Sequence, residues 1–176
     1  MEETTYFGKM KVHLQFINKE QYENLNSPKP STSHCFPIKE DKVLFTVNPR
    51  GLDIIGGHIE IGESPEEALI REAMEEGCII PKSYELIGAI EVDNRDSKEM
   101  ALEKGYPLLG YQLIYIVSDF EELEFNATHE CLARKYVNIE EVSHYHHNWL
   151  KSHQLALDEA KNQISKKVNS KTNRFK

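Results

Sequence analysis

The chain has 176 residues, of which 39% are hydrophobic, and this length is typical of one domain with a single hydrophobic core. Its formal net charge is −8, and six of its 21 Lys and Arg residues follow Glu159, so residues 1–159 carry 15 basic against 29 acidic side chains. This acidic body argues against a groove for a nucleic-acid polymer, which needs a basic surface, and no uninterrupted apolar segment is long enough to span a membrane.

The first third of the chain predicts strands joined by turns. Polar and apolar residues alternate from Lys9 to Phe16, which indicates a half-buried strand. Asn24–Ser33 is rich in Asn, Ser and Pro and predicts a loop. Cys35–Ile38 and Val43–Val47 then predict a hairpin, and Leu52–Ile55 leads into a glycine turn.

A helix with defined ends follows the glycine turn. Ser64 is its expected N-cap, Pro65 its first residue, and Glu67 completes a capping box with Ser64. Gly77 marks the expected end of the helix. The apolar residues expected to face the core are Leu69, Ala73 and Met74.

The rest of the chain predicts further strands and a closing helix. Tyr84–Val92 and Tyr111–Val117 are apolar runs typical of strands, and the charged segment Asp93–Lys104 between them is expected to cover a cleft. Ala133–Ile139 predicts a last strand, and Glu140–Ile164 has a helical pattern. This order suits an α/β fold with a mixed sheet between helices.

Three carboxylates crowd onto one face of the predicted helix. Glu72, Glu75 and Glu76 stand at positions i, i+3 and i+4, where like charges cost about 0.2–0.5 kcal/mol per pair. A hard divalent cation with oxygen ligands would convert this repulsion into coordination. The alternative is a solvated acidic helix, but such helices do not usually follow a glycine turn and a matched Arg71 at this spacing.

The spacing of Gly57, Glu63, Arg71-Glu72 and Glu75-Glu76 resembles the signature of the Nudix hydrolase superfamily, the MutT-like enzymes. The resemblance implies a Nudix-type α/β/α sandwich with a mixed β-sheet. We therefore expect residues 1–160 to form a single Nudix hydrolase domain, followed by a basic C-terminal tail at residues 161–176.

One position departs from the family pattern. The family has a glycine two residues after its last glutamate, where this chain has Cys78, and a glycine stands one residue earlier as Gly77. A glycine there could end the helix sooner and tilt Glu76, which would lower catalytic efficiency more than metal binding.

The resemblance implies roles for these residues. The metal ligands would be Glu72, Glu75, Glu76 and the carbonyl of Gly57, with Mg2+ as the cofactor and Mn2+ as the alternative. Arg71 would pair with Glu63 and brace the loop against the helix, so both join Glu75 as catalytic residues.

The general base is expected either within the helix set, at Glu75, or on a loop before a late strand. Glu130 occupies such a loop, in the segment 126–130, and its alternative reading is an ordinary solvated glutamate. Aromatic residues that could stack on a base, or else belong to the core, are Tyr106, Phe36 and Phe45.

The predicted reaction is magnesium-dependent hydrolysis of a pyrophosphate bond in a nucleoside diphosphate derivative. A nucleoside triphosphate is the most ordinary substrate, and an oxidised purine nucleotide is a special case. The alternative is a non-catalytic Nudix-fold module that binds nucleotides and regulates. We expect a small-molecule nucleotide as the partner, no nucleic-acid polymer or membrane, and a monomer or homodimer.

Three further features complete the sequence. Cys35, Cys78 and Cys131 are odd in number and widely spaced, which predicts reduced thiols, and the acidic N-terminus lacks an apolar signal region, so we expect a cytoplasmic protein. The basic tail is either an arm for RNA or membranes or the end of a frayed helix. The histidines near the last helix suggest a second metal site or, more simply, a solvated helix; they are His144, His146, His147 and His153.

Overall fold

The computed structural model describes residues 2–126, 130–146 and 148–172, and for residues 167–172 the backbone alone. The strands in these residues form one mixed sheet with the order β1-β2-β7-β8-β3-β4-β5, in which β6 pairs with β3 and β9 pairs with β4. The strands are β1 (Glu2–Phe7), β2 (Met10–Asn18), β3 (Pro30–Lys39), β4 (Lys42–Asn48), β5 (Gly51–Asp53), β6 (Ile55–His58), β7 (Ile79–Asp93), β8 (Leu109–Glu122) and β9 (Ala133–Asn138). The helical segments are α1 (Lys19–Glu23), α2 (Pro65–Gly77), η1 (Arg95–Ser97), α3 (Lys98–Glu103), α4 (Val142–Tyr145) and α5 (Lys151–Thr172).

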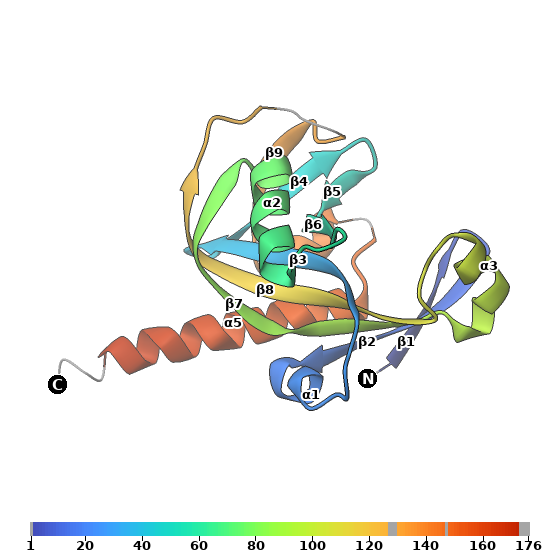
Figure 1. Cartoon of the computed structure of the whole chain (residues 1–176). Helices are drawn as coiled ribbons and strands as arrows, with labels where there is room; N and C mark the ends of the chain where they lie inside the picture. Colours follow the sequence, from blue (N-terminus) through green and yellow to red (C-terminus); the bar gives the residue numbers. More distant parts are fainter. Residues whose placement is uncertain (1, 127–129, 147, 173–176) are drawn as a thin grey trace.

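The sheet lies between two helices, with α2 on one face and α5 on the other (Figure 1). Strand alternation explains this arrangement, because successive side chains of β3 point to opposite faces. Phe36 packs in the core cluster that contains Leu157 of α5. Cys35 packs in the cluster that contains Leu69 of α2. The predicted α/β fold and its α/β/α sandwich are therefore confirmed.

Several element boundaries differ from the sequence prediction. The loop expected over Asn24–Ser33 ends early, because β3 begins at Pro30. The helical pattern over Glu140–Ile164 is divided between α4 and α5. Helix α5 extends to Thr172, so the expected start of the tail at residue 161 falls within a helix. Of the six basic tail residues, four have side chains outside the described part of the chain: Lys167, Lys171, Arg174 and Lys176.

Two predictions about burial are also corrected or refined. Met74 was expected to face the core, but its side chain is exposed, and Ala68 faces the core instead. Phe36 and Phe45 are fully buried core residues and cannot stack on a ligand, whereas Tyr106 is exposed. No helix among the described residues is both long and apolar enough to cross a membrane.

Helix α2 has the ends that its sequence specifies. Ser64 accepts a hydrogen bond from the Glu67 N–H, and the Glu67 carboxylate accepts one from the Ser64 N–H at 2.8 Å. At the other end Cys78 adopts the left-handed conformation, with φ 48° and ψ 47°. The helix therefore runs through Gly77, and Cys78 takes the left-handed turn that the family pattern gives to glycine.

Strand β1 was not predicted from the sequence, and it contacts the start of helix α5. It pairs with β2, and both lie near α3 at one end of the molecule (Figure 1). The Glu3 carboxylate also accepts hydrogen bonds from the backbone N–H groups of Lys151, at 3.0 Å, and Ser152, at 2.6 Å. A side chain of the first strand thus caps the first turn of the last helix.

Candidate active site

The glycine turn lies directly against helix α2. Gly56 has a φ of 148°, and an added Cβ would lie 2.3 Å from the Ser33 carbonyl oxygen, so the position requires glycine. An added Cβ on Gly57 would lie 2.3 Å from Glu72 Oε1. The lack of a side chain therefore lets Gly56 pack against β3 and lets Gly57 approach the Glu72 carboxylate.

Arg71 connects the loop after β6 to the helix. Its guanidinium donates to both oxygens of Glu63, with Nε 2.8 Å from Oε1, and also to the carbonyl of His58. It further contacts Glu72 at 2.7 Å and Glu75 at 3.3 Å. These contacts, above all the hydrogen bonds to Glu63, raise the pKa of Arg71, so it stays charged. The expected Arg71–Glu63 pair is present and fixes the loop.

Glu76 is the most perturbed carboxylate of the site. Its Oε2 accepts a hydrogen bond from the Gly56 N–H at 3.0 Å. Burial raises the pKa of Glu76 to about 7, and the nearby charges of Glu72, Asp53 and Glu75 add to the effect. Burial and the neighbouring carboxylates therefore oppose the ionisation of Glu76.

The donor chemistry of this group suits a hard divalent cation, which prefers carboxylate and carbonyl oxygens. The lack of a side chain on Gly57 lets the Glu72 carboxylate lie against the turn, and a cation would relieve the repulsion on Glu76. Across the described ranges, no three His, Cys, Asp or Glu side chains are already gathered in a geometry able to hold a metal ion. Arg71 contacts Oε1 of Glu72 and Oε2 of Glu75, so a cation would share these two carboxylates with the guanidinium.

Glu130 lies on the expected loop. Its described ion pair is with Arg50 and not with a residue of helix α2. Its Oε2 is 3.1 Å from Arg50 Nη1, and its side chain is 70% exposed. Arg50 in turn lies 3.9 Å from Asp53. Residues 127–129 of the same loop lie outside the described residues.

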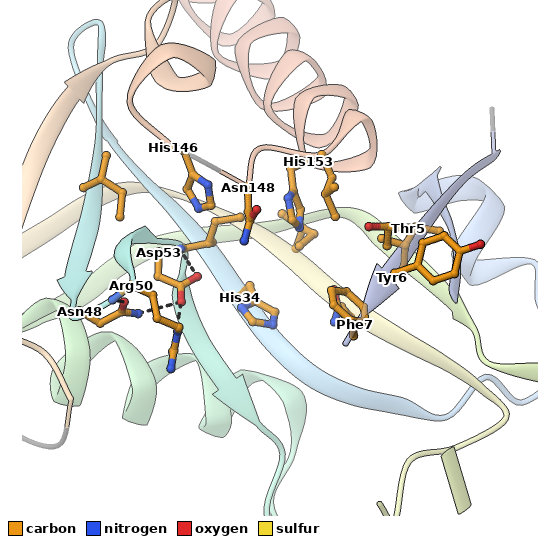
Figure 2. Close-up of a pocket in the computed structure, with 16 residues that line it drawn as sticks. Thr5, Tyr6, Phe7, His34, Asn48, Arg50, Asp53, His146, Asn148 and His153 are labelled. Carbon is orange, nitrogen blue, oxygen red and sulfur yellow. Dashed lines mark hydrogen bonds and ion pairs between the residues drawn. The ribbon is translucent and has the colours of Figure 1, made fainter. Parts of the chain in front are cut away.

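A cavity of about 310 Å³, called cavity 1, lies beside Asp53 (Figure 2). Asp53 accepts a hydrogen bond from the Asn48 side chain at 3.0 Å. His34 and His153 also line the cavity, and burial lowers the pKa of each to about 4, so both imidazoles are neutral. Among the described residues that line cavity 1, Arg50 is the one permanent cation.

The sequence did not predict that three histidines line cavity 1. His146 and His153 of the expected solvated helix instead line cavity 1 together with His34, which lies more than 100 positions earlier in the chain. His147 lies outside the described residues. Only the pairing of β3 with β6 brings His34 beside the glycine turn, and no local pattern signals that pairing.

Comparison with solved structures places this fold among known hydrolase folds. A pyrophosphohydrolase of Bacillus subtilis, BsRppH, is 24% identical, with a TM-score of 0.57 over 78% of this chain and 77% of its own. A NUDIX hydrolase from Nitrosomonas europaea is 20% identical, with a TM-score of 0.57 over 77% of this chain and 90% of its own. A protein described as an ADP compounds hydrolase is 15% identical, with a TM-score of 0.57 over 95% of this chain and 93% of its own.

No curated protein matches the chain in sequence. The model of the NUDIX domain, however, matches residues 28–160, which is most of the chain and includes the glycine turn, α2 and the first part of α5. The carboxylates and the Arg71–Glu63 pair described above fall within this match. The chain therefore belongs to the Nudix hydrolase family.

Proposed function

We propose that the protein hydrolyses a pyrophosphate bond in a nucleoside diphosphate derivative with the help of Mg2+, or of Mn2+ as the alternative. A nucleoside triphosphate is the reference substrate, and an oxidised purine nucleotide is a special case. The observation that carries the proposal is the packing of Gly57 against Glu72 beside the half-buried carboxylate of Glu76. This arrangement presents oxygen ligands at a turn that a diphosphate can approach.

Each residue of the site has a defined task in this proposal. Glu72, Glu75, Glu76 and the Gly57 carbonyl would hold the cation, which neutralises the diphosphate oxygens and lowers the pKa of a water molecule when bound. Arg71 and Glu63 keep the loop in place through their paired hydrogen bonds. The absence of a side chain on Gly57 keeps the backbone of the turn close to the Glu72 carboxylate.

The proton of the attacking water goes to a carboxylate. We assign this role to Glu130, with Glu75 as the alternative. Glu130 is exposed and paired with Arg50, which lines cavity 1, so the pair lies at the rim of the space next to Asp53. A substrate phosphate could displace Glu130 from Arg50 and release the carboxylate for proton transfer.

The test is a hydrolysis assay on nucleoside triphosphates, nucleotide sugars and dinucleotides, with Mg2+ and with a chelator. We expect Mg2+-dependent release of phosphate, pyrophosphate or nucleoside monophosphate from at least one class. Glu72→Gln should lose most of this activity. Glu60→Gln is the matched control. It also removes one negative charge, but from an exposed side chain on the loop between β6 and α2. Nucleotide binding without turnover would refute the enzymatic proposal and support a regulatory module.

A further inference from the structure

The last turn of helix α2 carries charges of the wrong sign for its position. Glu75 and Glu76 stand two residues and one residue before Gly77, where the helix ends. The C-terminal end of a helix is its negative end, because its last carbonyl groups have no partner within the helix, so carboxylates there destabilise the turn. The turn contains no basic residue of its own. A cation from another part of the chain is therefore needed to stabilise the turn that bears two of the expected metal ligands.

Arg134 of strand β9 supplies this cation. Strand β9 passes the end of α2 (Figure 1), and Arg134 Nη1 donates hydrogen bonds to the carbonyl oxygens of Gly77 and Cys78, each at 3.0 Å. Nη2 donates to the carbonyl oxygen of Leu123, just after the end of β8, also at 3.0 Å. The Arg134 side chain is only 19% exposed, and Glu122 lies 3.4 Å from Nη2. One guanidinium thus joins the end of α2 to β8 and β9.

The surroundings of Arg134 hold its guanidinium in place. Tyr136, two residues later in β9, donates its hydroxyl to Glu122 Oε1 at 2.8 Å, and Lys39 Nζ lies 3.2 Å from the same oxygen. These two contacts, together with the charge of Arg134, lower the pKa of Glu122, so its carboxylate stays ionised. Arg134 is therefore fixed between a charged carboxylate and three backbone carbonyl oxygens.

The same contacts reach the segment that carries Glu130. The Leu123 N–H donates to the Cys78 carbonyl at 2.8 Å, and the Asn126 N–H donates to the Cys78 Sγ at 3.4 Å. Leu123 and Asn126 precede Glu130 in the chain, and Arg134 follows it by four residues. Residues on both sides of Glu130 are therefore tied to the end of α2.

We propose that Arg134 is a positioning residue, whose guanidinium fork holds the last turn of α2 so that one divalent cation can use both Glu75 and Glu76. The inference rests on the proposed function, because it takes these two carboxylates as metal ligands. Its described hydrogen bonds to this end of the chain's acidic helix go to backbone carbonyl groups, so Arg134 acts through the position of the turn. A lysine would keep the charge but lose the planar fork that reaches α2 and β8 together.

Binding of Mn2+ in the absence of nucleotide tests the position of the carboxylates independently of turnover, and electron paramagnetic resonance of the free ion measures it. Arg134→Met removes the charge and the fork but keeps an aliphatic side chain. It should weaken Mn2+ binding by about 10- to 100-fold, the usual loss when a residue that orients metal ligands is removed. At saturating metal, kcat for the best nucleotide substrate should fall while its KM changes little. Arg134→Lys should recover at most part of both losses.

Two control variants separate positioning from a general loss of stability. Val137→Ala is in the same strand and removes part of a side chain that is 2% exposed, but Val137 packs in the core cluster that contains Leu157 of α5. Lys82→Met removes one positive charge from an exposed ion pair with Glu121 on β7 and β8. Both should bind Mn2+ as the wild type does. All variants are compared at a temperature at which circular dichroism shows them folded.

The outcomes distinguish the inference from the hydrolase proposal. Wild-type Mn2+ affinity in Arg134→Met, or an equal loss in Val137→Ala, would overturn the inference and leave the hydrolase proposal in place. Wild-type affinity in Arg134→Lys would also overturn it, and this variant decides the question if Arg134→Met does not fold. A wild-type protein that binds Mn2+ but hydrolyses no nucleotide would refute the hydrolase proposal, and the comparison of Mn2+ affinities would still decide the inference. A wild-type protein that binds no Mn2+ would overturn the role of Arg134.

Discussion

Replacing Glu76 by glutamine should stabilise the metal-free protein at alkaline pH and remove most of its turnover. The carboxylate is half-buried beside Gly56, and partial burial raises its pKa from 4.5 to about 7. At about pH 8 such a change corresponds to at most roughly 3 kcal/mol of destabilisation by the charged form. Because the group keeps some contact with solvent, we expect about half of this value, roughly 1.5 kcal/mol.

The sign follows from proton binding. The folded state binds this proton more tightly than the unfolded state, so the cost of the charged carboxylate is absent below about pH 4.5 and complete above about pH 7. The glutamine side chain is neutral at every pH and can still accept the hydrogen bond from Gly56. The difference in unfolding free energy between variant and wild type should therefore grow between these two pH values.

The assay is urea unfolding in the presence of a chelator at several pH values, with Glu60→Gln as the control for the loss of one charge. Added Mg2+ should stabilise the wild type more than Glu76→Gln, since a ligand charge has been removed. A variant that is less stable than wild type at about pH 8 in chelator would refute the electrostatic reasoning. Near-normal turnover at saturating Mg2+ would refute the assignment of Glu76 as a metal ligand.

Two further predictions concern Cys78 and Glu130. Cys78→Gly should keep activity and change the free energy of unfolding by no more than about 1 kcal/mol. Glycine relieves the strain of the left-handed backbone, and this gain offsets the lost contacts of the thiol. A large loss of activity would show that the thiol itself is required. Glu130→Gln should lower kcat by about 10²- to 10⁴-fold with little change in KM, while Glu124→Gln, on an exposed side chain, should change neither. A loss of less than a few-fold in Glu130→Gln would move the general base to Glu75.

Helix α2 could be predicted closely from sequence because its determinants are local. The capping box, the first-turn proline and the spacing of Arg71 from Glu63 all lie within the helix or the loop before it. The far end of the helix could not be predicted in this way, because Cys78 rather than Gly77 takes the left-handed conformation.

Cavity 1 could not be predicted, because long-range pairing creates it. Strand β1 carries few buried residues, so its sequence lacks the alternation that revealed β2. Tyr106 looked equivalent to Phe36 as a stacking residue, yet β3 turns Phe36 into the core, whereas Tyr106 follows α3 and is exposed. Such distinctions depend on which face of the sheet a residue occupies.

The contact between Glu3 and the start of α5 has a consequence for synthesis on the ribosome. Strand β1 is made before α5, and the backbone groups that its glutamate caps belong to Lys151 and Ser152, more than 140 residues later. Contacts so distant in sequence form late in folding, because a long loop must close before they are gained. A nascent chain that has released β1 but not yet α5 therefore lacks one wall of cavity 1, to which both His153 and Thr5 contribute. Ligand binding in that cavity should begin only when the last helix has left the exit tunnel.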